Sequence, residues 1–416
     1  MIKERNRPST DSIDRALAAA GPGPDPVINW ILAALVALGA FVIFDAGFAR
    51  SIQNGDGLVP GEFKSQVFYA VIAAIIGFGV SRVKGTFWQK FALPIFLTAM
   101  AGLIAVKVFG HEMNGAQRWI KLGPVSIQPA EFMKVAAIIY VASVLASRKT
   151  WKSPKTKDWA QWADRVMVPK LVRLIPMFAI LFAVLLIELE PDLGTAAVIG
   201  STAFFMFFFG GISKGSKFWV TAIAIFVVGG MVWKSPFRME RVSNHFHRWE
   251  ADRIDDVGYQ TVQSEIAMAS GGLTGTGPGT GRVKHLMPAA TTDFVFATVA
   301  EETGFVGVTA LLALLGALVW RIWLMAQRCK NKFAQNVCYG MTIWLTIQAT
   351  VNLMMANGLL PPIGIPFPFI SSGGSSLIAL MVGIGLCQSV ASMREGEIFE
   401  ASRNRRRNRR TRLSRA

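Results

Sequence analysis

A single carboxylate, Asp293, stands where a polar, glycine-rich segment meets a strongly apolar run within residues 258–307. A carboxylate at the edge of an apolar run is partly desolvated, which raises its pKa and makes it a better general base. Thr292 and Asp293 are also residue types that cap helices, so capping is the alternative interpretation. Glu301 and Glu302 follow one or two helical turns later, where a helix cap offers no explanation.

A second charged group, Glu131 and Lys134, lies at the start of another apolar run. Their spacing of three residues puts both side chains on one face of a helix. Ionisable residues within a membrane span are costly and are therefore functional candidates, although a self-neutralising ion pair explains this one equally well. Asp192, in the Glu-Pro-Asp-Leu-Gly-Thr stretch that begins at Glu190, has its own alternative role at the amino end of the following helix.

The fourth polar cluster extends over residues 357–376 and includes Ser371. Its prolines and glycines favour a re-entrant backbone, which is tolerated at membrane depth only where protein or a watery cavity covers it. Basic side chains near the four clusters could pair with the oxygens of a phosphate-bearing ligand. They are Arg118, Lys121, Arg238, Arg241, Arg248 and Lys284.

The composition identifies the elements that must position these residues. Hydrophobic residues make up 52% of the 416 residues, charged residues only 17%, and the mean hydropathy is +0.42. Apolar runs near the roughly 20 residues that cross a bilayer recur along the chain, unlike the short alternating segments of a barrel. The sequence therefore predicts an all-α polytopic integral membrane protein with about ten transmembrane helices. The expected spans are 27–46, 67–80, 91–108, 130–146, 171–187, 195–209, 218–233, 305–325, 338–355 and 375–392.

Positive charge predicts the orientation of these spans. An even number of spans puts both termini on one side, together with the basic connection after the fourth span and the eight arginines between Arg403 and Arg415. That side is cytoplasmic, so the four polar clusters and the loop 234–292 lie outside. The net charge of +17 then reflects orientation and attraction to anionic membrane lipids. No aromatic residue interleaves with the tail arginines, so the prediction is no nucleic acid.

The expected organisation has three parts. Residues 1–25 are polar and form a disordered cytoplasmic arm, residues 26–393 form the membrane domain, and residues 394–416 form an arginine-rich cytoplasmic tail. The chain has only three cysteines, in or beside predicted spans and without metal-type spacing. We therefore expect neither a disulfide framework nor a zinc site.

Seven short motifs, in this order along the chain, resemble the SEDS family of membrane proteins, to which RodA, FtsW and SpoVE belong. Each motif is weak alone, but seven in the correct order across ten spans are specific, and the match covers nearly all of the membrane region. The motifs begin at Gly115, Gln128, Glu190, Gly258, Ser270, Thr292 and Ser371.

The resemblance implies a multi-pass peptidoglycan glycosyltransferase of the bacterial cytoplasmic membrane. Such enzymes polymerise lipid II, an undecaprenyl-pyrophosphate-linked disaccharide pentapeptide, into β-1,4 glycan strands at the outer face. Their partner is a class B penicillin-binding protein, a transpeptidase. Asp293 matches the family's essential carboxylate, Trp119 matches a loop residue, and Glu131, Lys134 and Asp192 match the central cavity. The other residues expected near the substrate are Arg118, Gln263, Ser264, Glu301 and Ser371.

The chain departs from the family pattern just before Asp293. Residues 287–291 lack the family's usual Glu and His, and Ser372 replaces a Tyr, which leaves Asp293 more isolated as the acid–base group. A divalent cation, Mg²⁺ or Mn²⁺, is an open alternative for stabilising the leaving pyrophosphate, although no metal-ligand spacing is present. Two other functions stay open: a lipid II flippase, and a non-catalytic scaffold for a penicillin-binding protein. Residues 275–279 and 300–302 look slightly more like FtsW, which favours division over elongation.

Overall fold

The structure of the chain is a computed structural model that describes most of the predicted membrane domain. The described residues are 22–53, 55, 57–113, 116–123, 125–147, 168–210, 221–222, 229–230, 236–250, 258–287 and 290–394. Most of the amino-terminal arm, most of the seventh expected span (218–233) and nearly all of the arginine-rich tail lie outside these residues.

Helices dominate the described part of the chain, as the apolar runs predicted. Nine of the ten expected spans coincide with helices there. They are α2 (Pro26–Gln53), α3 (Gly61–Arg82), α5 (Ala92–Phe109), α6 (Pro129–Ser147), α8 (Val168–Glu188), α9 (Leu193–Phe209), α14 (Val295–Arg328), α15 (Lys332–Ala356) and α16 (Gly374–Val390). Within the described ranges, α2, α3, α5, α6 and α14 are long and apolar enough to cross a membrane, and most of α8, all of α9 and α16 are shorter apolar helices. The prediction of a multi-pass helical membrane protein is confirmed.

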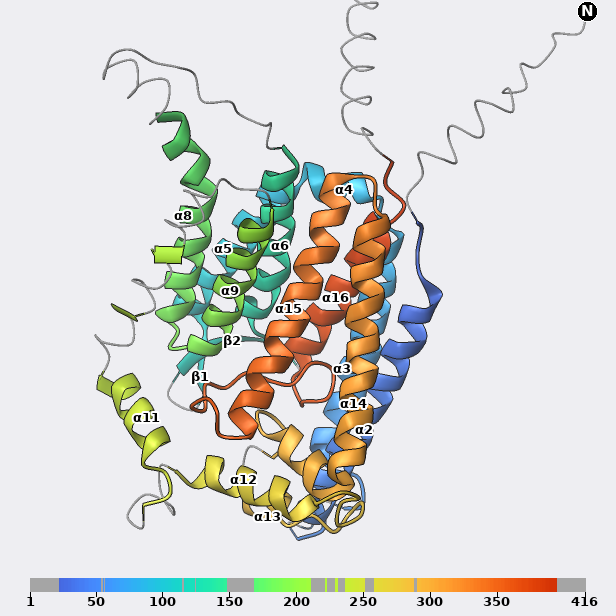
Figure 1. Cartoon of the computed structure of the whole chain (residues 1–416), viewed down its shortest axis with the longest axis vertical. Coiled ribbons are helices and arrows are strands. Elements are labelled where there is room, and N and C mark those ends of the chain that lie inside the picture. Colours follow the sequence, from blue (N-terminus) through green and yellow to red (C-terminus); the bar gives the residue numbers. More distant parts are fainter. Residues whose placement is uncertain are drawn as a thin grey trace, which may run out of the picture.

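The apolar helices pack into one bundle, in which α6 lies among α5, α9, α15 and α16 (Figure 1). Thirteen of the 19 residues of α6 are buried, because these four helices pack against it. The most extensive pairing in the bundle joins α3 to α16, and α14 lies against both α2 and α15. Intrahelical hydrogen bonds satisfy the backbone of each helix, which is the requirement for crossing hydrocarbon.

Helix α14 is bent near its start. Gly304 adopts a φ of 61°, a left-handed conformation that glycine tolerates, and it separates residues 295–303 from the rest of the helix. The expected eighth span, 305–325, is the part that follows the bend. The short segment before the bend carries Glu301 and Glu302.

Short elements gather at one end of the bundle, which we call the outer end (Figure 1). They are α11 (Pro236–Phe246), α12 (Tyr259–Gly271) and α13 (Val283–Leu286), whereas α4 (Gly85–Lys90) lies at the opposite end. A three-stranded antiparallel sheet with the order β1-β2-β3 adds to the all-α prediction. Its strands are β1 (His111–Met113), β2 (Ala116–Leu122) and β3 (Val125–Ile127).

Candidate functional site

The segment 357–373, between α15 and α16, is the centre of the outer end. Its large apolar side chains from Ile365 to Ile370 are buried, whereas Leu359 is exposed. Two polar side chains of α15 satisfy its backbone, because Asn352 Nδ2 donates to the Ile365 carbonyl at 2.6 Å and Gln348 Nε2 donates to the Pro366 carbonyl at 3.0 Å. Irregular backbone at this depth is thus covered by protein, as the prolines and glycines of this segment predicted.

Hydrogen bonds to its backbone carbonyls hold the turn that carries Asp293 in place. Ser372 N donates to the Thr291 carbonyl at 2.8 Å, and Ser371 Oγ donates to the Thr292 carbonyl at 2.6 Å. Asn352 Nδ2 donates to the carbonyl of Asp293 itself at 2.8 Å. Three consecutive carbonyls are therefore fixed by residues that lie about 60 to 80 positions further along the chain.

The side chain of Asp293 is used differently. Helix α14 begins after Phe294, and no side-chain hydrogen bond caps it, so the capping interpretation of Asp293 is wrong. Among the described residues, none donates a hydrogen bond to the half-buried Asp293 carboxylate. A carbon atom placed at the Cβ position of Gly364 would lie 3.6 Å from its Oδ2, so the segment 357–373 borders this carboxylate.

The pKa of Asp293 is raised to about 6. Burial is the largest cause, the negative charge of Asp192 adds to it, and the positive charge of Arg118 opposes it. A general base works best when its pKa lies near the operating pH. The site therefore holds a carboxylate that can accept a proton near neutral pH and has no described donor bound to it.

Asp192 joins this site through two hydrogen bonds of its own. Its Oδ1 accepts from Thr195 N at 3.0 Å, so the predicted capping of α9 is confirmed. Its Oδ2 accepts from Gln128 Nε2 at 2.8 Å, which fixes the second oxygen. Asp293 is consequently less isolated than the missing Glu and His suggested, because a second, firmly held carboxylate raises its pKa.

Arg118 holds the chain that leads to Asp192. Its Nε donates to the Glu190 carbonyl at 3.1 Å, and one of its Nη atoms donates to the Pro191 carbonyl. Some of the N–H groups of the guanidinium therefore donate to backbone carbonyls, and only the remaining N–H groups can bind phosphate oxygens. Trp119, the next residue on β2, is half-buried. Within the described residues, no hydrogen bond or ring contact joins Trp119 to Asp293.

Glu131 and Lys134 form a buried ion pair of 2.7 Å. Lys134 Nζ also lies 3.4 Å from Gln348 Oε1 and 5.6 Å from the centre of the Trp344 ring. Trp344 Nε1 donates to the same Gln348 oxygen at 2.7 Å. The structure thus contains the self-neutralising ion pair. Gln348 connects this pair to the segment 357–373 through its contacts with Lys134 and the Pro366 carbonyl.

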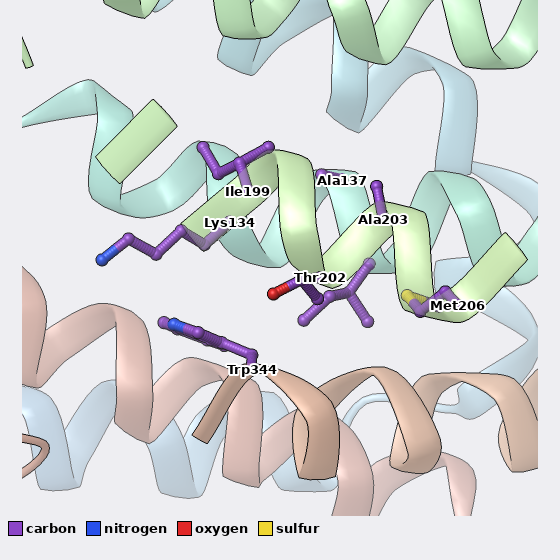
Figure 2. Close-up of a pocket in the computed structure, with 8 residues that line it drawn as sticks. Lys134, Ala137, Ile199, Thr202, Ala203, Met206 and Trp344 are labelled. Carbon is purple, nitrogen blue, oxygen red and sulfur yellow. The ribbon is translucent and has the colours of Figure 1, made fainter. Parts of the chain in front are cut away.

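A narrow gap, too tight to admit a water molecule, lies beside Lys134 between α6, α9 and α15 (Figure 2). Its lining is apolar apart from Lys134 and Thr202, whose hydroxyl finds no partner in the described part of the chain. Lys134 and Trp344 lie together at one end of the gap and Met206 at the other (Figure 2).

Other predicted site residues have structural contacts. Ser264 Oγ donates to the Ala356 carbonyl at 2.7 Å and so links α12 to the end of α15. Gln263, its neighbour on α12, is half-buried, and its side chain hydrogen-bonds to no described residue. Ser371 Oγ accepts from Phe367 N at 2.7 Å in addition to its contact with the Asp293 turn.

Two of the cations expected to bind phosphate form ion pairs within the chain. The Lys284 side chain is only 1% exposed and lies 2.6 Å from Glu302 and 2.8 Å from Asp45. Arg248 forms a 2.7 Å ion pair with Glu265. The expectation that Lys284 faces a ligand is wrong, because its buried ammonium group lies between two carboxylates of the chain. For Arg248, which is partly exposed and pairs with one carboxylate, it stays a prediction.

Glu190 is a candidate that the sequence did not single out. Its side chain is fully buried, and neither carboxylate oxygen has a hydrogen-bond partner among the described residues. Burial and the charge of Asp192 raise its pKa to about 8, against the opposing charges of Lys107 and Arg118. The signal in the sequence is the Glu-Pro-Asp motif, which places Glu190 two residues before Asp192.

The described residues do not provide a metal centre. Among them, no three His, Cys, Asp or Glu side chains are grouped closely enough to hold a metal ion.

Comparisons with known proteins identify the family. A family model described as a cell cycle protein, FtsW/RodA/SpoVE, matches residues 26–396. A probable peptidoglycan glycosyltransferase FtsW of Idiomarina loihiensis is 33% identical over 375 residues, which cover 88% of this chain and 87% of that protein. Stage V sporulation protein E of Bacillus subtilis is 32% identical over 371 residues, covering 88% and 97%.

Solved structures agree with this assignment. A chain from a structure described as structural coordination of polymerization and crosslinking by a peptidoglycan synthase complex superposes with a TM-score of 0.69 at 27% identity, covering 88% of this chain and 97% of the other. The rod shape determining protein RodA of Thermus thermophilus superposes with a TM-score of 0.61 at 26% identity, covering 88% and 96%. The sequence and the fold together show that this chain belongs to the FtsW/RodA/SpoVE family.

Proposed function

We propose that this protein is a peptidoglycan glycosyltransferase that polymerises lipid II at the outer face of the bacterial cytoplasmic membrane. The observation that carries the proposal is the Asp293 site: a fixed backbone, a carboxylate without a described hydrogen-bond donor, and a pKa of about 6. The relatives that carry the name peptidoglycan glycosyltransferase support the same activity.

In the proposed mechanism, Asp293 takes the proton from the 4-hydroxyl group of the acceptor sugar. The hydroxyl oxygen attacks the anomeric carbon of the donor, and the bond from that carbon to the pyrophosphate oxygen breaks. One displacement converts an α-linked donor into a β-1,4 bond, so a single base suffices and no covalent carboxylate intermediate is required. The proton ends on Asp293, and the electron pair of the broken bond leaves with the pyrophosphate.

The charges around Asp293 suit this role. Asp192 raises the pKa of Asp293 and therefore its basicity, while Arg118 keeps the ionised form accessible. The remaining donors of Arg118, and the exposed Lys121 on the same strand, are candidates for binding the leaving pyrophosphate.

The test uses the purified full chain in detergent with labelled lipid II. Wild-type protein should form glycan polymer, and Asp293→Asn should lower the rate by ~10²–10⁴-fold, the usual contribution of a general base. Glu240→Gln, an exposed carboxyl-to-amide change on α11, is the matched control and should leave the rate unchanged. Normal polymer from Asp293→Asn would refute the assignment of the base. Because detergent offers no second membrane face, polymer formation also distinguishes this enzyme from a flippase or a scaffold.

We further propose that the protein works with a penicillin-binding protein in cell division. The similar chain from a peptidoglycan synthase complex supports such a partnership, and the FtsW names of the relatives favour division over elongation. Co-purification of a tagged full chain from dividing cells tests the partnership. Recovery of a transpeptidase is the expected result, and its absence from cross-linked preparations would contradict the proposal.

A further inference from the structure

The chain on either side of Asp293 is closed into a loop by two neighbouring glutamates. Glu301 Oε1 accepts from Arg282 N at 2.9 Å, and its Oε2 accepts from Val283 N at 3.0 Å. Glu302 Oε1 accepts from Gly281 N at 3.2 Å. Asp293 lies near the middle of the loop that these bonds close, since it is ten residues after Val283 and eight before Glu301.

The absence of a side chain at Gly281 is what allows this closure. A Cβ atom there would lie 2.8 Å from Glu302 Oε1 and 2.9 Å from Glu301 Oε2, which is closer than real Cβ atoms come to other atoms. The carboxylates of Glu301 and Glu302 thus approach the same stretch of backbone, and a side chain at position 281 would push both of them away.

Lys284 joins this loop to a second helix. Its ammonium group lies 2.6 Å from Glu302 Oε1 and 2.8 Å from Asp45 Oδ2 on α2, and the side chain is 1% exposed. A buried charge is tolerated only with partners, so removing Lys284 would leave two neighbouring carboxylates without a cation, whereas removing either carboxylate would leave Lys284 with a single partner. Burial alone would lower the pKa of Lys284, but the hydrogen bonds and charges of Asp45 and Glu302 outweigh it and raise the pKa.

The bend in α14 adds backbone contacts to the same region. Because Gly304 interrupts the helical ladder, the amides of Phe305 and Val306 donate instead to the carbonyls of Gly272 and Leu273, at 2.9 and 3.1 Å. In return, the glycine-rich loop donates to the carbonyls of the two glutamates at 3.0 Å. The loop between α12 and α13 is thereby bound to the short helical segment that follows Asp293.

We propose that Glu301, Glu302, Lys284 and Asp45 form a staple that positions Asp293 for catalysis without touching the substrate. The staple ties residues 281–284 to the start of α14 and to α2, so that the Asp293 turn between them meets the segment 357–373 in one register. This inference rests on the proposed function for its effect on rate, but the staple itself is a property of the fold. Misplacement of a catalytic group by about 1 Å can cost ~10²-fold in rate, so positioning residues have large effects.

The test compares Glu302→Gln, Glu301→Gln and Lys284→Met with His285→Ala in the full-length protein. His285 neighbours Lys284 on α13 and is exposed, so it is the matched control. We expect the staple variants to speed amide hydrogen exchange in residues 281–294 while the other helices stay protected. We expect kcat for lipid II to fall by ~10–100-fold with KM changed less than threefold.

A double-mutant cycle sharpens the test. If Glu302 and Lys284 act as one unit, the loss of kcat in the Glu302→Gln/Lys284→Met double variant is smaller than the product of the single losses. Unchanged exchange in residues 281–294 would overturn the staple, even if the wild-type protein made no polymer. Exchange that rises equally throughout the chain, with kcat following the folded fraction, would also overturn it. Glu301→Gln keeps one acceptor oxygen and supplies a folded variant if Lys284→Met does not fold.

Discussion

Two charged regions at the outer end of the bundle are built in opposite ways. At Asp293, other residues hold the backbone and leave the carboxylate without a described donor. At Glu131 and Lys134, the charged atoms themselves are the contact, in a buried pair of 2.7 Å that Gln348 extends. The difference separates a charge kept available for proton transfer from charges that are neutralised to survive burial.

Substitutions in the two regions should differ most in their effect on the stability of the protein. Lys134→Met should lower the free energy of unfolding by about 3–5 kcal/mol, because it leaves Glu131 as an uncompensated buried charge. Asp293→Asn should instead leave the fold intact or stabilise it above pH 6. Thermal unfolding of both variants in detergent measures the difference.

A second variant checks the cause. Glu131→Gln/Lys134→Met removes both charges and should recover most of the stability that Lys134→Met loses. If Lys134→Met kept wild-type stability but lost polymerisation, Lys134 would belong with Asp293 and the contrast between the two regions would disappear.

Asn352→Leu should have the next largest effect, since Asn352 is the side chain that holds the Asp293 carbonyl. The change removes two donated hydrogen bonds, of 2.8 Å to Asp293 and 2.6 Å to Ile365, and leaves buried carbonyls without a donor. Each unsatisfied group costs about 1–3 kcal/mol. We expect the polymerisation rate to fall by ~10²-fold through misplacement of the carboxylate, beyond the loss of folded protein.

The control for Asn352→Leu is a rate per folded molecule. Rates should be corrected for the folded fraction, determined by size-exclusion chromatography and thermal unfolding. A corrected rate equal to that of the wild type would show that catalysis does not require the hydrogen bonds from Asn352 to the backbone of the turn.

A smaller effect is expected on the pH dependence. With a pKa of about 6 for Asp293, the rate should fall tenfold per pH unit below pH 6, as the base becomes protonated. Asp192→Asn removes one cause of the raised pKa, so the acid limb should move to lower pH. Asn is also a good helix cap, so α9 should be preserved. Glu190, Lys107 and Arg118 are the ionisable groups that interact with one another beside Asp192, and all three are retained.

Stability should follow the same titration in a defined direction. The pKa of Asp293 is higher in the folded protein than its ordinary value of 3.8, so the folded state holds the proton more tightly. Stability from this group is therefore greatest at low pH and is lost as the pH rises from about 4 to 6. Asp293→Asn should abolish that component of the profile, which pH-dependent thermal unfolding can measure.

The sequence predicted the helices and the Asp293 turn because both have local signals. Apolar runs predict spans, and the change from polar to apolar residues marks the turn. Asn352, Gln348 and Asp45 escaped notice, since a polar residue inside a span shows its partner only in three dimensions. Lys284 was misjudged because a lysine in a polar loop gives no sign of burial. The sheet at β1–β3 was missed for a related reason, since strand formation depends on neighbouring strands.

Substitution of Ser264 should have the smallest effect, because this residue holds the fold and is not expected to react. Its hydroxyl, predicted to lie near the substrate, donates to the Ala356 carbonyl at 2.7 Å, and the residue is fully buried. Ser264→Ala removes this one hydrogen bond and should cost about 1 kcal/mol of stability, with kcat and KM unchanged. Ser371→Ala is the informative comparison, because it loses a bond of 2.6 Å to the turn that carries Asp293 and should lower kcat. Equal losses of kcat in both variants would show that substrate reaches α12. Ser264 would then belong with the residues that act on substrate and not with those that only hold the fold.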